Sequence, residues 1–194
     1  MISDHDRSYY IGASDTKFVM GNWNTQTFRN WWNIKMGFYS SEMDNIYLRT
    51  GSLYEPRILD YLEVEERDRQ IILSRLRVNL DGERGDSVIE VKTYGWKPNW
   101  KPPKEYLNQV QVELFATNKQ TGWIVAYGVT EEDYEAAELG FALPIEDDRI
   151  STFMVNRDDK WIEEEYLPRL WYLAECLEEE KLPCMEDFLE QKKN

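Results

Sequence analysis

The stretch Asp81–Lys92 is the feature that most constrains how this chain folds. Apolar alternation leads into an Asp-Gly pair, a short polar segment follows, and the apolar pattern then resumes. Asp-Gly is a common turn dipeptide. Because alternate residues of a strand share a face, Glu90 and Lys92 point one way and the apolar residues beside them point the other. The pattern predicts paired strands over 76–80 and 87–93.

The carboxylates of this hairpin are candidate metal ligands. Asp81 stands at the end of the first predicted strand and Glu90 inside the second. Two carboxylates that converge from paired strands suit Mg²⁺, a hard cation that prefers oxygen ligands. Lys92 beside them is suited to position or deprotonate an attacking water. An ordinary hairpin with a glutamate–lysine pair on its solvated face fits the same short pattern, so both interpretations stay open.

Length and composition predict one globular domain over residues 1–194. Aromatic residues make up 14% of the chain, which argues against disorder although 31% of the residues are charged. No apolar run approaches the roughly 18 residues of a membrane span. The first ten residues are polar and charged, unlike a secretory signal. We therefore expect a cytoplasmic protein with no membrane partner.

Few residues are available for thiol or imidazole chemistry. The chain has two cysteines, Cys176 and Cys184, and one histidine, His5. These are too few for a four-cysteine zinc site or a four-cysteine iron–sulfur cluster. A single histidine near the terminus also argues against Ser-His-Asp and Cys-His mechanisms. Reduced thiols are expected for the two cysteines in a cytoplasmic protein, with a structural pair as the alternative.

Charge is distributed unevenly. The net charge of −14 by itself argues against a nucleic-acid partner, because phosphates attract lysine and arginine. Much of the acid lies after residue 130, where we expect a solvated face, in the runs 131–133, 146–148, 163–165 and 178–180. Lysines and tryptophans gather instead among the prolines of 97–104. That segment is either a DNA-contacting loop or a packed proline-rich loop.

Helix and strand signals predict an α/β domain with a mixed β-sheet flanked by helices. We expect helices over 15–20, 26–36, 42–61, 104–118 and 158–180. We expect strands over 70–74, 76–80, 87–93, 122–129 and 150–155. Ser14 and Thr25 are the predicted N-caps of the first two helices. Gly51 and Pro56 are expected to interrupt the third helix, and Pro168 to kink the last one.

Three further motifs accompany the hairpin: Ile-Gly-Ala-Ser-Asp at 11–15, Gly-Ser-Leu-Tyr-Glu-Pro at 51–56 and Tyr-Leu-Asn-Gln-Val-Gln at 106–111. In this order and spacing the chain resembles the phage lambda exonuclease / YqaJ-like viral recombinase family of the PD-(D/E)XK nuclease superfamily. The resemblance covers residues 7–130 and leaves a C-terminal strand and helix at 145–194 outside the core motifs. It implies a PD-(D/E)XK restriction-endonuclease-like core.

The resemblance implies roles for the matched hairpin residues. Asp81 and Glu90 match the metal-binding carboxylates, and the backbone carbonyl of Val91 would complete the metal shell. Lys92 matches the catalytic lysine. Glu55 matches a helix glutamate that supports the metal site directly or through water.

The remaining matches lie on other segments. Gln109 matches the glutamine on the helix after the core motif, although a buried, satisfied amide fits this position equally well. Ser14 and Arg7 match a serine and an arginine that bind the 5′-phosphate end of DNA. A serine at a helix N-terminus offers a hydroxyl and free N–H groups to a phosphate, and an arginine adds a two-pronged contact.

The function that the resemblance implies is an Mg²⁺-dependent DNA exonuclease, with Mn²⁺ able to substitute. It would resect linear double-stranded DNA ends 5′→3′ for phage-type homologous recombination. The implied partners are DNA ends, a single-strand annealing protein and further copies of the chain in a trimer. The implied setting is the bacterial cytoplasm, with a phage or prophage origin.

Two alternatives stay open. The first is a related PD-(D/E)XK nuclease of other polarity, or an endonuclease of RecB/Cas4-like type without an iron–sulfur cluster. The second is a non-catalytic DNA-end-binding or protein-binding module on the same fold.

Overall fold

The computed structural model describes residues 8–39 and 45–192, which form two compact units. The terminal unit comprises the described parts of 1–42, 70–78 and 158–194, and the central unit those of 43–69 and 79–157. The predicted single nuclease domain over 1–194 stays a prediction. Arg7 lies outside the described residues.

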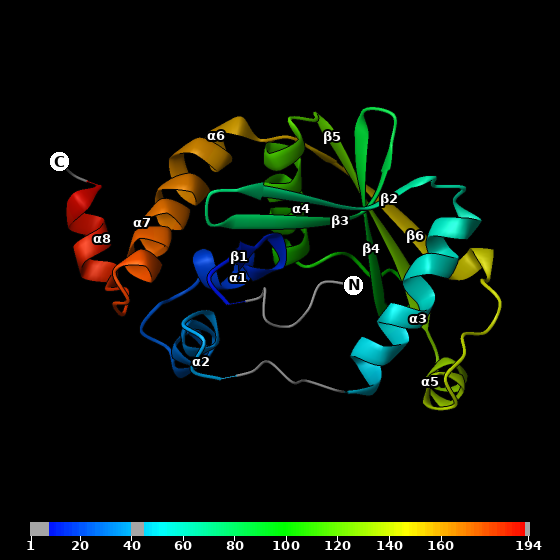
Figure 1. The fold of residues 1–194 in the computed structure, drawn as a ribbon. Helices are drawn as coiled ribbons and strands as arrows, with labels where there is room; N and C mark the ends of the chain where they lie inside the picture. The colour runs from blue at the N-terminus through cyan, green and yellow to red at the C-terminus, as the bar shows by residue number, and fades with distance from the viewer. Residues whose placement is uncertain (1–7, 40–44, 193–194) are drawn as a thin grey trace. The chain divides into compact units, whose positions relative to one another are not determined.

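The central unit carries the larger part of the sheet (Figure 1). Its elements are α3 (Ile46–Tyr61), β3 (Leu76–Arg84) from Asn79 onward, β4 (Ser87–Gly95), α4 (Lys104–Thr117), β5 (Thr121–Val129), α5 (Glu131–Glu138), η3 (Asp147–Arg149) and β6 (Ile150–Asn156). Strand β2 (Glu66–Leu73) begins in this unit.

The terminal unit is mostly helical. Its elements are β1 (Ile11–Gly12), η2 (Ala13–Asp15), α1 (Thr16–Val19), α2 (Gln26–Lys35), α6 (Asp159–Trp161), the π-helical turn η4 (Ile162–Tyr166), α7 (Leu167–Glu178) and α8 (Met185–Gln191). Thr25 caps α2 as predicted, since its hydroxyl accepts the N–H of Phe28 at 3.2 Å. Cys176 and Cys184 are both free thiols.

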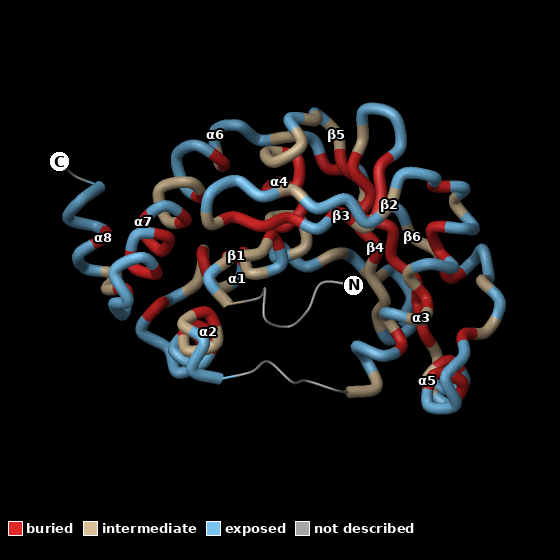
Figure 2. The backbone as a smooth tube through the Cα atoms, viewed as in Figure 1, coloured by how far each residue is buried: buried red, intermediate tan, exposed pale blue. Residues whose placement is uncertain are grey.

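Within the described residues, six strands form one mixed sheet, which confirms the predicted α/β class. The strand order is β1-β3-β4-β5-β6, with β2 paired to β3. β1 and β3 run parallel, β3 and β4 antiparallel, β4 and β5 parallel, and β5 and β6 antiparallel. The parallel pair needs a crossover connection, which α4 supplies. Figure 2 shows runs of buried residues on β3, β4 and β5, and burial continues on the helices α4 and α7.

The alternation predicted for β4 is confirmed. Ile89 and Val91 join the apolar cluster that includes Tyr54 and Ile58 of α3. Glu90 points the other way and accepts a hydrogen bond from Gln109 of α4. The strand therefore buries one apolar face against α3 and one partly charged face against α4.

The predicted interruption of the third helix is wrong, because α3 runs unbroken through Gly51 and Pro56. Pro56 has no N–H, so the backbone carbonyl of Ser52, one turn earlier, has no helical donor. Ser52 is exposed, so water can satisfy this carbonyl. Gly51 faces β4 closely, since an added Cβ would lie 3.5 Å from the Thr93 hydroxyl. The burial of Tyr54, Ile58 and Leu59 stabilises the helix as a whole.

The first strand of the hairpin also extends further than predicted. β3 continues to Arg84, so Asp81 lies inside the strand, and only Gly85 and Asp86 make the turn. Gly85 has a φ of 56°, which glycine adopts without strain. The polar residues of 81–84 are accommodated because buried Glu83 is paired with Arg69 at 2.6 Å and Lys119 at 2.9 Å.

Other predictions need correction at the helix ends. Ser14 is not an N-cap: the first helical turn begins at Ala13, and the side chain of Asp15 accepts the Gly12 N–H at 2.8 Å. The last predicted helix is divided into α6, a π-helical turn and α7, with Pro168 in the first turn of α7. Helices α5 and α8 and the two-residue strand β1 were not predicted. The structure holds no helix, among the residues it describes, that is long and apolar enough to cross a membrane.

Close packing of α4 on β5 gives the first testable prediction. A Cβ added at Gly122 would lie 2.4 Å from Val110 and 3.1 Å from Val88. We expect Gly122→Ala to lower the free energy of unfolding by about 1 to 3 kcal/mol in urea denaturation, because the core must shift. Gly95→Ala is the control, since nothing lies within 4 Å of its added Cβ. Equal stability of the two variants would contradict the packing described.

Candidate functional site

Glu90 is the centre of the candidate site and lies in the middle of β4. Its side chain is buried, with 2% of its surface exposed. One oxygen, Oε1, accepts the side-chain amide of Gln109 at 2.6 Å and lies 2.5 Å from the Lys92 ammonium. The other oxygen, Oε2, is buried without a hydrogen-bond donor. A buried carboxylate oxygen without a partner is costly, which favours a bound cation beside it.

Asp81 reaches this site from β3. Its Oδ2 accepts the backbone N–H of Val91 at 2.7 Å, so the carboxylate lies across the β3–β4 pair. Burial raises the pKa of Asp81 well above its usual range, and the charges of Glu90 and Glu55 raise it further. The hydrogen bond from Val91 and the charge of Lys92 oppose this rise without cancelling it.

Glu55 joins the same electrostatic cluster from α3. Burial raises its pKa, and the charges of Glu90 and Asp68 add to the rise, while Lys92 lowers it. Asp81, Glu55 and Glu90 thus come from three different elements and repel one another in a poorly hydrated region. The free energy of this repulsion favours a bound cation or a bound proton.

Glu113 is a site residue that the sequence interpretation missed. It lies one turn after Gln109 on α4 and is almost wholly buried. The Gln109 amide nitrogen donates to Glu113 at 3.0 Å as well as to Glu90, so the amide bridges two carboxyl groups. Burial raises the pKa of Glu113 well above its usual range, and the charge of Glu90 and a hydrogen bond to it add to the rise. The available signal was a glutamate set between the apolar residues Val112 and Leu114.

Lys92 is held between this cluster and an aromatic ring. Its ammonium lies 5.0 Å from the ring centroid of Tyr106, in addition to its ion pair with Glu90. Burial alone would lower the pKa of Lys92, but the neighbouring carboxylates of Glu90, Asp81 and Glu113 outweigh it and raise the pKa. The side chain is therefore a fixed, charged donor in this state.

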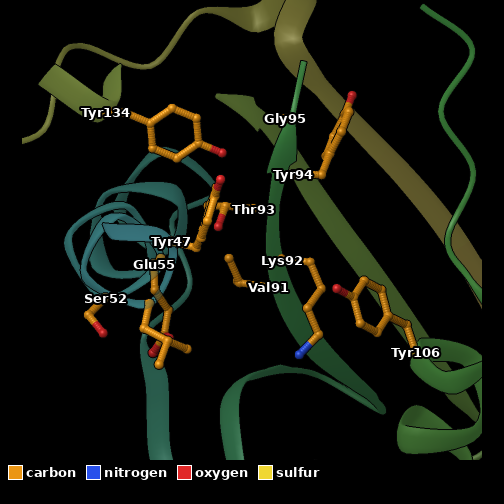
Figure 3. Close-up of a pocket in the computed structure, with 12 residues that line it drawn as sticks. Tyr47, Ser52, Glu55, Val91, Lys92, Thr93, Tyr94, Gly95, Tyr106 and Tyr134 are labelled. Carbon is orange, nitrogen blue, oxygen red and sulfur yellow. The ribbon is translucent and has the colours of Figure 1, made fainter. Parts of the chain in front are cut away.

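A cleft of about 520 Å³ opens beside the cluster (Figure 3). Figure 3 shows the Lys92 side chain and Tyr106 on one side of β4, with Glu55, Tyr47 and Tyr134 on the other. Val91, Thr93 and Gly95 of β4 also line the cleft, together with Leu48, Gly51, Ser52 and Tyr94. The charged cluster is therefore open to a ligand on one side.

The donor set of this cluster fits a hard divalent cation. All of its carboxyl groups are oxygen donors, and the Glu90 Oε2 atom lacks a partner. Within 8–39 and 45–192, however, no three His, Cys, Asp or Glu side chains stand together in the arrangement of a formed metal site. Glu90 is oriented by its ion pair with Lys92, and Asp81 is oriented by the hydrogen bond that it accepts from Val91.

The structure does not test the two predicted 5′-phosphate residues. Ser14 is exposed, lies in the terminal unit within η2, and has no N-cap role there. Arg7 is not among the described residues. Their predicted role stays a prediction.

The proline-rich segment 97–104 is packed at Trp100, and its contact with DNA stays a prediction. Trp100 is packed: its ring stacks on Tyr94 at 4.2 Å and meets Phe153 edge-on. The side chains of Lys97, Lys101 and Lys104 are exposed. The acidic run 131–133 also departs from a purely solvated face, because Asp133 is fully buried and paired with Arg149 at 2.5 Å.

Comparison with known proteins gives matches in structure but not in sequence. No protein-family model and no curated protein matches the chain. An alkaline exonuclease from Laribacter hongkongensis superposes with a TM-score of 0.66 at 21% identity, over 97% of this chain and 95% of that one. Its complex with dAMP gives a TM-score of 0.65, also at 21% identity and with the same coverage. A phage-related exonuclease from Haemophilus somnus 129PT gives 0.61 at 13% identity, over 91% of this chain and 98% of that one. These likenesses show that the chain shares the fold of these exonucleases.

The pKa of Glu113 predicts a specific dependence of stability on pH. In the folded protein the pKa of Glu113 is raised above the usual 4.5, so folding of the metal-free protein takes up a proton at pH values above 4.5. The free energy of unfolding therefore falls as the pH rises above that value. Glu113→Gln keeps the hydrogen bonds to Gln109 and Glu90 without needing the proton. We expect it to remove up to about 1.4 kcal/mol per pH unit from this slope.

Urea denaturation in EDTA between pH 5 and 8 measures the slope. Glu105→Gln, an exposed position in the first turn of the same helix, is the matched control. An unchanged slope in Glu113→Gln would show that Glu113 is ionised in the folded protein.

Proposed function

We propose that this protein is a divalent-metal-dependent deoxyribonuclease that acts as an exonuclease on linear double-stranded DNA. The observation that carries the proposal is the cluster of Asp81, Glu90 and Lys92 beside a cleft that Lys92 itself lines, with Glu90 Oε2 lacking a partner. The hairpin pattern in the sequence predicts each of these residues as a site residue. The fold likeness to two exonucleases supports the same class of reaction.

The residues that would hold the metal are the carboxylates of Asp81 and Glu90 and the carbonyl of Val91, with Glu55 acting directly or through water. Mg²⁺ is the proposed ion, and Mn²⁺ would substitute because it accepts similar oxygen ligands. When bound, such an ion polarises the phosphate and lowers the pKa of a bound water. It would also relieve the repulsion that raises the pKa of Asp81 and Glu55.

The protein's own side chains supply orientation and charge. Lys92 is fixed by Glu90 and Tyr106, so its ammonium is oriented to place a water and to stabilise negative charge on the phosphate. Gln109 fixes the direction of the Glu90 carboxylate through one N–H and is itself fixed by Glu113 through the other. The site is thus preorganised by hydrogen bonds from α4.

The finer features of the proposal come from the family resemblance. They are 5′→3′ polarity, recognition of a 5′-phosphate by Ser14 and Arg7, and resection for phage-type recombination with a single-strand annealing protein. A trimeric assembly and a location in the bacterial cytoplasm belong to the same set.

Digestion of linear duplex DNA, labelled separately at its 5′ and 3′ ends, tests the function. We expect Mg²⁺-dependent release of the 5′ label as mononucleotides, and none in EDTA. Asp81→Asn should lower the rate by more than about 100-fold, because it removes a charged metal ligand while its amide can still be accommodated.

Asp86→Asn is the matched control, since the same change falls in the exposed turn of the same hairpin. Cleavage by Asp81→Asn at the rate of this control would refute the site. Release of the 3′ label first would replace the proposed polarity and leave the nuclease assignment standing. A folded protein that cleaves no form of DNA with Mg²⁺ or Mn²⁺ would indicate a binding module.

A further inference from the structure

The cleft beside the carboxylates is lined mainly by aromatic rings. Four tyrosines contribute to it: Tyr47, Tyr94, Tyr106 and Tyr134. Among the described residues that line it, Lys92 is the only positively charged side chain and Glu55 the only negatively charged one. Successive phosphates would find little compensating charge here, whereas a neutral, flat ring would find large apolar contacts.

Tyr47 and Tyr134 form an aromatic pair in this lining that is less buried than a pair in the core. Tyr47 lies in the first turn of α3 and is 67% exposed. Its ring meets Tyr134 of α5 edge-on, with centroids 5.5 Å apart and planes at 83°. The edge-to-face contact fixes the Tyr47 ring while leaving much of it uncovered.

The residue next to Tyr134 makes this arrangement rigid. Asp133 is buried and accepts hydrogen bonds from the hydroxyl of Tyr54, from the Thr130 N–H at 2.7 Å and from Arg149 at 2.5 Å. These bonds attach α5 to α3 and to the residue that precedes β6. An aromatic ring presented from so firmly bound a helix loses little conformational freedom when it binds a ligand.

The position of Tyr47 and Tyr134 relative to the charged cluster indicates which kind of ligand the cleft would bind. Figure 3 shows Tyr47 and Tyr134 in the upper part of the cleft, with Glu55 and the Lys92 ammonium in the lower part. The volume of about 520 Å³ lies within the roughly 300 to 1,000 Å³ of small-molecule sites. A nucleotide with its phosphate at the charged end would therefore place its base toward the tyrosines.

We propose that Tyr47, supported by Tyr134, stacks on an unpaired nucleobase of the DNA strand whose phosphate lies at the Asp81–Glu90–Lys92 cluster. The inference rests on the proposed function for the placement of that phosphate. Every base has a π-face, so the contact carries no strong sequence preference. It holds the strand in place for cutting without any hydrogen-bond reading of the bases.

A short single-stranded oligonucleotide that carries 2-aminopurine at its terminal position tests the inference, because stacking quenches the fluorescence of this base. We expect wild type and Tyr47→Phe to quench and bind alike, since both have the ring. Tyr47→Ala should weaken binding by about 5- to 150-fold and abolish the quenching. Tyr134→Ala should reduce both to a smaller extent.

Tyr61→Ala is the matched control, because Tyr61 is an exposed tyrosine at the other end of α3 and does not line the cleft. An oligonucleotide whose terminal nucleotide is abasic should bind wild type as weakly as the intact one binds Tyr47→Ala. Equal quenching by wild type and Tyr47→Ala, or no quenching by wild type, would overturn the inference.

Digestion of linear duplex DNA with Mg²⁺, measured alongside the oligonucleotide binding, separates this inference from the proposed function. A wild-type protein that cuts DNA while Tyr47→Ala binds and quenches unchanged refutes the stacking role alone. A wild-type protein that does not cut, but whose quenching depends on Tyr47, refutes the nuclease function and supports a base-binding cleft.

Discussion

The structure depends on keeping the carboxylate of Glu90 buried in the middle of a sheet. An isolated charge in that position would be very costly, so its neighbours must satisfy it. Lys92 supplies the opposite charge from the same face of β4, and Gln109 supplies an N–H from α4. Asp81, Glu55 and Glu113 crowd further carboxyl groups around it, and the pKa of each of the three is raised.

The elements around this cluster hold its carboxyl groups in place although they repel one another. Strand β4 is flanked on both sides by paired strands, α3 covers one face with aromatic and aliphatic side chains, and α4 covers the other. The hairpin end is fixed separately, because Glu83 is paired with Arg69 and Lys119. These contacts hold the carboxyl groups close together, and the proposed cation would relieve their repulsion.

Much of this could be predicted from local sequence. The period-two pattern of Val88 to Lys92 places Glu90 and Lys92 on one face, and the helix at 104–118 follows from its apolar spacing. Glu113 was missed because α4 is buried on several sides, so a single glutamate among Val112 and Leu114 does not interrupt any clear pattern.

Contacts between residues far apart in the sequence explain the other predictions that were wrong. The residues 81–84 resemble a turn, and they become a strand because Arg69 and Lys119, far away in sequence, neutralise Glu83. Asp133 looks like part of a solvated acidic run, yet Tyr54 and Arg149 bury it. Local propensity cannot report such partners, since they are brought together only by the folded chain.

The most direct test of a cation site at this cluster is calorimetric titration of Mn²⁺ and Mg²⁺ into the metal-free protein, in two buffers that differ in ionisation enthalpy. We expect saturable binding with release of protons, because carboxyl groups with raised pKa must ionise to act as ligands. Asp81→Asn should lose this binding and Asp86→Asn should keep it. Absence of binding to the folded wild-type protein, or equal binding by Asp81→Asn, would contradict the assignment of Asp81 and Glu90 as metal ligands.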